Sequence, residues 1–146
     1  MAVMIRFAFH ARRFSRCRWA ASAVEFAMLL PLFLLMVLGI VVFGSYLAMV
    51  HGVQQLAAEA ARTSVAGLNN AERDSLATGY VSAHASSYPL IASDDVTVTT
   101  TTSGTNVFVV TVNYDASRSF IFALPALVPM PSSRIERSAA IPFGGF

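Results

Sequence analysis

The organisation of this chain is decided by residues 26–50, FAMLLPLFLLMVLGIVVFGSYLAMV. The stretch holds 25 residues and no charged side chain. At about 1.5 Å of rise per residue, a helix of this length spans about 37 Å, more than the roughly 30 Å hydrocarbon core of a bilayer. The apolar core of a cleavable secretory signal is shorter, about 7–15 residues. We therefore expect one membrane-spanning helix.

Charge is distributed unevenly around this run. Residues 1–50 carry five Arg and one Glu, a net charge of +4, whereas residues 51–146 carry five Arg and seven acidic residues, a net charge of −2. The first five all precede the run: Arg6, Arg12, Arg13, Arg16 and Arg18. Because Arg residues that flank a span stay on the cytoplasmic side, we expect a cytoplasmic N-terminus. Residues 51–146 would then lie across the membrane, in the periplasm if this is a bacterial inner membrane.

The composition excludes several classes of protein. The length of 146 residues allows one small domain with appendages. Hydrophobic residues make up 55% and charged residues only 12%, about half the charged share of a soluble domain. With 8 Gly, 6 Pro and a single Cys, collagen-like, disordered and disulfide-scaffold sequences are excluded.

An Ala-rich helix is expected directly after the run. Between residues 52 and 66, apolar or small side chains recur at spacings of three and four, which indicates one helical face. That face comprises Val53, Leu56, Ala57, Ala60, Ala61 and Val65. We expect this stalk helix to continue the span, to pair Glu59 with Arg62, and to stop at Gly67. Its apolar face packs against neighbouring helices, on the chain's own sheet, or in both ways.

Residues 67–146 predict a small domain of helix and strands. Asn70 is expected to cap a second helix, with Leu76, Tyr80 and Ala83 as its apolar stripe. Three strands are expected, at residues 96–102, 107–114 and about 135–141, the first two forming a hairpin. The predicted fold class is therefore α+β. Its parts are a basic leader (1–20), a transmembrane helix and stalk (21–66), and an exported domain with a short antiparallel sheet (67–146).

Residues 119–131, SFIFALPALVPMP, form a second uncharged stretch. It has 13 residues and three prolines, too short and too interrupted to cross a membrane. It either covers the domain's core, lies at the membrane surface, or contacts a partner subunit, and the first of these is favoured.

No catalytic or ligand-binding pattern is found in the sequence. It has no Gly-rich phosphate loop and no nucleophile elbow. The three His residues lie far apart: His10, His51 and His84. Asp94 and Asp95 are more typical of a turn than of a cation site, and the Arg cluster has no aromatic platform beyond Trp19. We expect no enzymatic activity, no cofactor, no metal and no nucleic-acid partner.

A single carboxylate, Glu25, stands at the start of the run. It is either an interfacial group or a group buried in an assembly, where it needs a cation because an unpaired charge in hydrocarbon is costly. Val24-Glu25-Phe26-Ala27, the early Pro31 and the later segment QQLAAEAAR (residues 54–62) together resemble the TadE/TadG-like family. These are minor pseudopilins of the tight-adherence (Flp) pilus system. The resemblance covers about residues 18–66.

The resemblance implies that a prepilin peptidase cuts between Ala20 and Ala21, which makes Glu25 the fifth residue of the mature chain. The family usually has Gly before the cut, where this chain has Ala20. Glu25 would pair with the new amine of Ala21 in a neighbouring subunit. The residues expected to pack against other membrane helices are Phe26, Pro31, Gly39 and Gly44, followed by the stalk face of Leu56, Ala57, Ala60 and Ala61.

The implied function is structural, in the assembly of a tight-adherence pilus or a related secretion machine. The implied partners are the lipid bilayer, other pilins or pseudopilins, the pilus assembly platform and the prepilin peptidase. The implied location is the bacterial inner membrane or the extracellular pilus itself. The alternative is an unprocessed single-span anchor whose exported domain binds a partner in an envelope complex.

Overall fold

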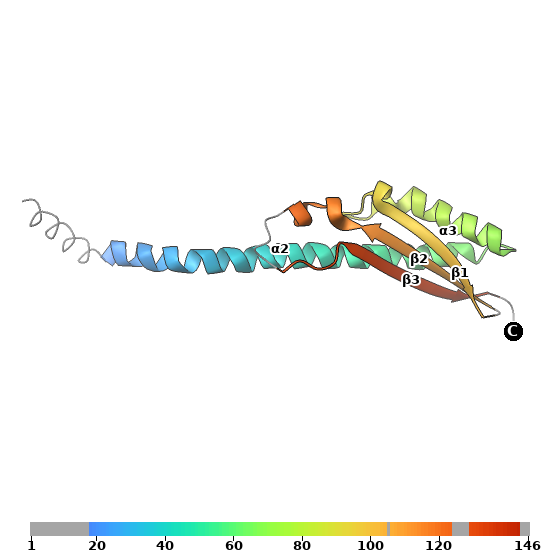
Figure 1. Ribbon diagram of the computed structural model, residues 1–146, viewed down its shortest axis with the longest axis horizontal. Helices are drawn as coiled ribbons and strands as arrows, with labels where there is room; N and C mark the ends of the chain where they lie inside the picture. The colour runs from blue at the N-terminus through green and yellow to red at the C-terminus, as the bar shows by residue number, and fades with distance from the viewer. Residues whose placement is uncertain (1–17, 105, 124–128, 144–146) are drawn as a thin grey trace, which may run out of the picture. The chain divides into compact units, whose positions relative to one another are not determined.

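The computed structural model describes residues 18–104, 106–123 and 129–143 (Figure 1). Its main elements are α2 (Arg18–Ser64), α3 (Asn70–His84), β1 (Val96–Ser103), β2 (Val107–Asp115) and β3 (Arg134–Pro142). The chain forms two compact units, residues 1–40 and residues 41–146, called here the first and second units. The helices and the antiparallel sheet confirm the α+β fold class. Most of the expected leader lies outside the described residues.

α2 is a single helix of 47 residues that runs through Pro31. The apolar run and the Ala-rich stretch after it therefore belong to one element, as expected. The helix ends at Ser64, three residues before the expected stop. The Gly67 N–H donates to the Ser64 carbonyl at 3.0 Å. Gly67 is instead required for close packing, because a Cβ there would lie 2.8 Å from the backbone nitrogen of Arg73.

The sheet has three antiparallel strands in the order β1-β2-β3. All three expected strands are confirmed, each within one residue of its expected limits. Side chains of the central strand alternate between buried and half-buried, so one face of the sheet is the core face. Its buried side chains on β2 are Phe108, Val110, Val112 and Tyr114. The register continues this face on the neighbouring strands, with Val98 opposite Val112 and Ile135 opposite Tyr114.

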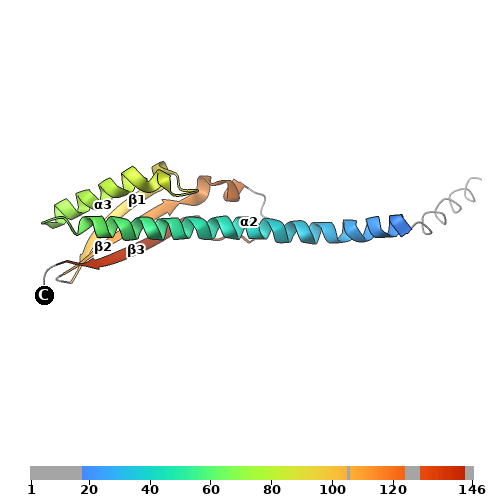
Figure 2. The same cartoon turned by 180° about the vertical axis from the view of Figure 1, so that it is seen from behind.

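The part of α2 in the second unit packs on this core face (Figure 2). The α2 side chains in the core are Met49, Val53, Leu56, Ala57, Ala60 and Ala61, each no more than 2% exposed. The apolar face of the expected stalk therefore packs on the chain's own sheet, which is one of the two arrangements that the sequence left open. The Glu59–Arg62 ion pair is confirmed at 2.7 Å.

α3 begins one residue earlier than the sequence predicted. Asn69 is the N-cap, and its side-chain oxygen accepts a hydrogen bond from the Glu72 N–H at 2.9 Å. The Glu72 carboxylate in turn accepts from the Leu68 N–H at 2.8 Å, so two free N–H groups at the helix start are satisfied. Asn70, the expected cap, is the first helical residue.

The buried residues of α3 lie one position after the predicted ones. Ala77 and Val81 are the buried residues, whereas Leu76 and Tyr80 are half-buried and Ala83 is exposed. α3 runs beside β1 (Figures 1 and 2). The two elements are joined by the Thr100 hydroxyl, which donates to the Asp74 carboxylate at 2.7 Å.

The segment before β3 covers part of the core. It contains two short turns, η3 (Ala116–Arg118) and η4 (Phe120–Ala123). Ile121 is fully buried, whereas Phe120 is 49% exposed. The favoured expectation for residues 119–131, core cover, therefore holds at Ile121; residues 124–128 lie outside the described part.

Replacing Leu56 by Ala tests how far the second unit depends on α2. Leu56 is fully buried, so truncation leaves a cavity, and we expect the free energy of unfolding to fall by about 2–5 kcal/mol. Leu68 is 88% exposed, and Leu68→Ala should change this free energy by less than about 0.5 kcal/mol.

Urea unfolding of the full chain in detergent micelles measures both variants. Near-UV circular dichroism reports on the second unit, because all four tyrosines lie there. Equal losses in Leu56→Ala and Leu68→Ala would contradict the role of this helix face.

Candidate functional site

The first unit presents an apolar helix surface. Most large apolar side chains of α2 between Val24 and Ile40 are exposed, Met28 by 76% and Leu32 by 67%, while Leu30 and Leu38 are half-buried. A helix that is apolar on all sides needs an apolar environment, either other helices or lipid. In the described part of the chain, one helix, α2, is long and apolar enough to cross a membrane. α2 is thus fit to be a membrane anchor.

Glu25 lies on this surface, near the helix start. Its side chain is exposed, and no described side chain forms an ion pair with it. The backbone of Ala20 and Ala21 belongs to the first turn of α2, while their side chains and that of Arg18 lie outside the described part. The processing site and the Glu25 pairing therefore stay predictions. A cut between Ala20 and Ala21 requires the first helical turn to open, which helix ends do readily.

The four residues expected to pack against neighbouring membrane helices are accessible. Phe26 is 65% exposed, and Pro31 is exposed as well. At Gly39 and Gly44, a Cβ would meet no other segment of the described chain within 4 Å, so another helix can approach closely. Phe26 and Pro31 are five residues apart, so they do not share one helix face. They are separate contact points rather than a stripe.

The stalk-face residues are not accessible in this way. Leu56, Ala57, Ala60 and Ala61 are 0–2% exposed within the second unit. Contact between these side chains and another subunit would require the sheet to leave α2.

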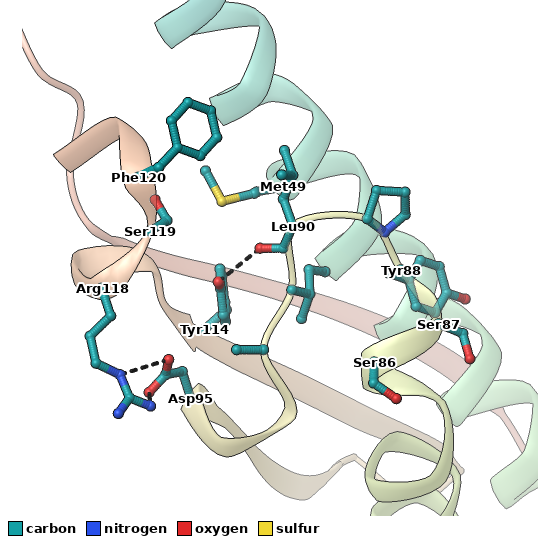
Figure 3. A pocket seen from close by; sticks show the side chains of 13 residues that line it. Met49, Ser86, Ser87, Tyr88, Leu90, Asp95, Tyr114, Arg118, Ser119 and Phe120 are labelled. Atoms are coloured by element: carbon teal, nitrogen blue, oxygen red, sulfur yellow. Dashed lines mark hydrogen bonds and ion pairs between the residues drawn. The ribbon is translucent and has the colours of Figure 1, made fainter. Parts of the chain in front are cut away.

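A pocket of about 600 Å³ opens in the second unit (Figure 3). Met49 of α2, Tyr114 of β2 and the loop that follows α3 line it. The Tyr114 hydroxyl donates to the Leu90 carbonyl at 2.9 Å. Leu90 has a φ of 67°, in the left-handed region that costs a residue with a Cβ about 1–2 kcal/mol. The sequence reasoning missed this pocket, and the only signal for it was the Pro89 turn.

An ion pair lies at one side of the pocket. The Arg118 Nε donates to the Asp95 carboxylate at 3.0 Å, and a second Arg118 nitrogen pairs with the other oxygen of the same group. The hydrogen bond to Asp95 raises the pKa of Arg118. Asp95 is therefore engaged by a cation of the chain itself. No group of three metal-ligating side chains occurs among the described residues.

The pocket is also lined by two tyrosines, Tyr88 and Tyr114, and by Ser119. Burial raises the pKa of Tyr114 and of Tyr88 above 10.0, so both are neutral phenols at ordinary pH. The Ser119 hydroxyl is buried and has no hydrogen-bond partner in the described chain. His84 stacks on Tyr80 with 4.2 Å between ring centroids, and neither of these residues lines this pocket.

The exposed apolar helix that carries Glu25 and continues into a buried Ala-rich face can be compared with known families. Residues 20–62 match the model of the TadE-like protein family. The TadE-like match confirms the resemblance drawn from the sequence. It covers the apolar run, Glu25 and the core-facing part of α2, and it ends at Arg62 before α3 and the sheet. No curated protein and no solved structure matched the chain.

The raised pKa of Tyr114 predicts a loss of stability at high pH. The folded state holds the phenolic proton more tightly than the unfolded state, whose pKa is near 10.0. The stabilisation is therefore complete below about pH 10 and is lost as the pH rises through the higher folded-state pKa. Tyr114→Phe should weaken this alkaline loss, while costing about 0.5–1.5 kcal/mol at neutral pH through the missing hydrogen bond.

The measurement is urea unfolding of the full chain in micelles at several alkaline pH values, with phenolate absorbance recorded in parallel. Tyr88 keeps a raised pKa in the variant, so part of the alkaline loss should remain. An unchanged dependence of unfolding on pH in Tyr114→Phe would contradict the assignment to Tyr114.

Proposed function

We propose that this protein is a pseudopilin-like component of a tight-adherence pilus machine, and that it acts by packing its membrane helix against other pilins rather than by catalysis. The TadE-like match over residues 20–62 supports a component associated with this pilus system. The observation that carries the proposal is the exposed apolar surface of α2 with Glu25 at its start.

In this proposal α2 crosses the inner membrane with the N-terminus in the cytoplasm. Support comes from the five Arg residues that precede the apolar run, against one acidic residue in the first fifty. The second unit would then lie in the periplasm. The first unit would contact lipid, other pilins and the assembly platform, and the prepilin peptidase would act on its cytoplasmic end.

Glu25 supplies the specific contact of this assembly. Once the leader is removed, Ala21 carries a free amine, and this amine in one subunit pairs with the Glu25 carboxylate of the next. In a low-dielectric helical bundle, each charge alone is costly, so pairing offsets the two desolvation penalties. The pair forms only when the two helices have one particular offset along their axes. It therefore also fixes the axial register between neighbouring helices.

The rival proposal is an unprocessed anchor whose second unit binds a partner in an envelope complex. One observation favours it, namely the pocket of about 600 Å³ with the Arg118–Asp95 ion pair at its side. The function of such an anchor would depend neither on a cut after Ala20 nor on the charge of Glu25.

Mass spectrometry of the mature protein, purified from membranes with its secretion system present, separates the two proposals. We expect a chain that begins at Ala21. Ala20→Gly restores the residue usual before the cut and should be processed at least as completely as the native chain. An intact chain that retains Met1 in both forms would overturn the pseudopilin proposal in favour of the anchor.

Glu25→Gln removes the charge with almost no change of shape. We expect normal membrane insertion but impaired assembly, because the Ala21 amine is left unpaired at a cost of about 3 kcal/mol or more. This corresponds to an association about a hundredfold weaker. Pilus yield and co-purification with other pilins measure the effect.

Two further variants serve as controls for this experiment. Glu25→Asp keeps the charge on a shorter side chain and should retain part of the assembly. Glu136→Gln makes the same change at an exposed position of the second unit and should have no effect. Normal piliation in Glu25→Gln would refute the pairing.

A further inference from the structure

Exposed apolar side chains gather at one end of the second unit. Its large apolar residues with high exposure are Val41, Phe43, Leu47, Val65, Leu68, Leu90 and Phe120. The first three lie where α2 enters the unit, and Leu90 and Phe120 line the same pocket as Met49 of α2. Only Val65 and Leu68 follow the other end of α2.

This end of the unit coincides with the end of the apolar run. The run extends to Val50, but the side chains of α2 are already buried at Val42, which is 2% exposed, and again at Met49. On other sides of the same helical segment, Phe43 is 44% exposed and Leu47 54% exposed. Residues 41–50 are therefore both the end of the uncharged run and the first part of the second unit.

Helix length places this segment at the membrane surface. About 20 helical residues cross the hydrocarbon core, so a span that begins at Phe26 ends at about residue 45. The second unit begins at Val41, before that point is reached. If α2 crosses the membrane as proposed, no spacer separates the unit from the bilayer, and the side chains near Met49 would lie at the depth of the lipid headgroups.

The side chains at this depth suit a membrane interface. Leu90 is 42% exposed and Phe120 49% exposed, and Phe120 lies beside Met49 in Figure 3. Tyr46 and Tyr88 are half-buried nearby residues, of the aromatic type that is enriched where membrane meets water. Arg118, which lines the same pocket as Leu90 and Phe120, is paired with Asp95, so this ion pair adds no net charge to the contact surface.

We propose that the second unit rests on the outer surface of the bilayer through an apolar rim formed by Leu90 and Phe120. The rim inserts among the lipid headgroups, and apolar burial rather than attraction to anionic lipid drives the contact. Two of the three roles considered for residues 119–131 then apply to neighbouring residues. Ile121 covers the core, and Phe120 contacts the membrane. The inference rests on the proposed insertion of α2 into the membrane.

Depth-dependent fluorescence quenching tests the rim in the full chain. In a Trp19→Phe background, three variants each carry one Trp, at Phe120, at Phe33 of the apolar run, or at Leu68. Each is reconstituted into phosphatidylcholine vesicles with bromine near the headgroup end or near the far end of the acyl chains. Near-UV circular dichroism of the tyrosines checks that the second unit is folded in every variant.

We expect Phe120→Trp to lose fluorescence mainly to the shallow bromines and Phe33→Trp mainly to the deep ones. Leu68→Trp should lose fluorescence to neither. One outcome would overturn the membrane contact of the rim and leave the membrane span intact. In it, Phe33→Trp is quenched, but Phe120→Trp is quenched no more than Leu68→Trp. If Phe33→Trp is not quenched either, the proposal that α2 spans the membrane is overturned as well.

Two further measurements separate a lipid contact from its competitors. The shallow quenching of Phe120→Trp should not change when the protein is diluted into excess lipid. An unquenched, blue-shifted emission that disappears on dilution would instead place a second copy of the chain on the rim and overturn the proposal. The quenching should also be equal with and without added phosphatidylglycerol, and a marked rise would overturn the apolar basis of the contact.

Discussion

The second unit depends on the packing of α2 against the buried face of the sheet. The sheet has one apolar face that must be covered by another element, and the 15-residue α3 buries only Ala77 and Val81. α2 supplies six fully or almost fully buried side chains to this core. Three of them, Ala57, Ala60 and Ala61, are small, so the sheet can approach the helix backbone closely. A larger side chain at any of these positions would have to displace neighbouring core side chains.

The same helix provides apolar side chains to two different environments. In the first unit they are exposed and require lipid or other helices, whereas in the second unit they are buried against the chain's own strands. Hydropathy alone does not distinguish these cases, because Met49 and Leu32 contribute equally well to an apolar run. For this reason the uncharged run extends to Val50, although the core of the second unit already includes Met49 and a buried Val42 precedes it.

Elements with strong local patterns were predictable from the sequence. The three strands were located to within one residue. For β1 and β2 the reason is that runs rich in Val and Thr and bounded by turns leave few alternatives. The start of α3 was misplaced because Asn69 and Asn70 are both suitable caps. Its stripe was misplaced because size favours Leu76 and Tyr80 as core residues, whereas Ala77 and Val81 are buried. The pocket was missed because loops form it and Leu90 adopts its positive φ without a Gly to indicate it. The role of Glu25 stays a prediction, because its proposed partner is an amine that only proteolysis creates in another subunit, and a single chain cannot contain the pair.

The bond between Thr100 and Asp74, which joins α3 to β1, has a consequence for aggregation. β1 is an edge strand of only Val, Thr and Ser without a single charge, the type of sequence that adds readily to a strand of another molecule. The opposite edge, β3, carries Arg134, Glu136 and Arg137, which discourage such pairing. On the β1 side the neighbouring α3 takes the place of these charges. A molecule in which α3 has detached, for example before folding is complete, would therefore be the form most prone to self-association through its sheet.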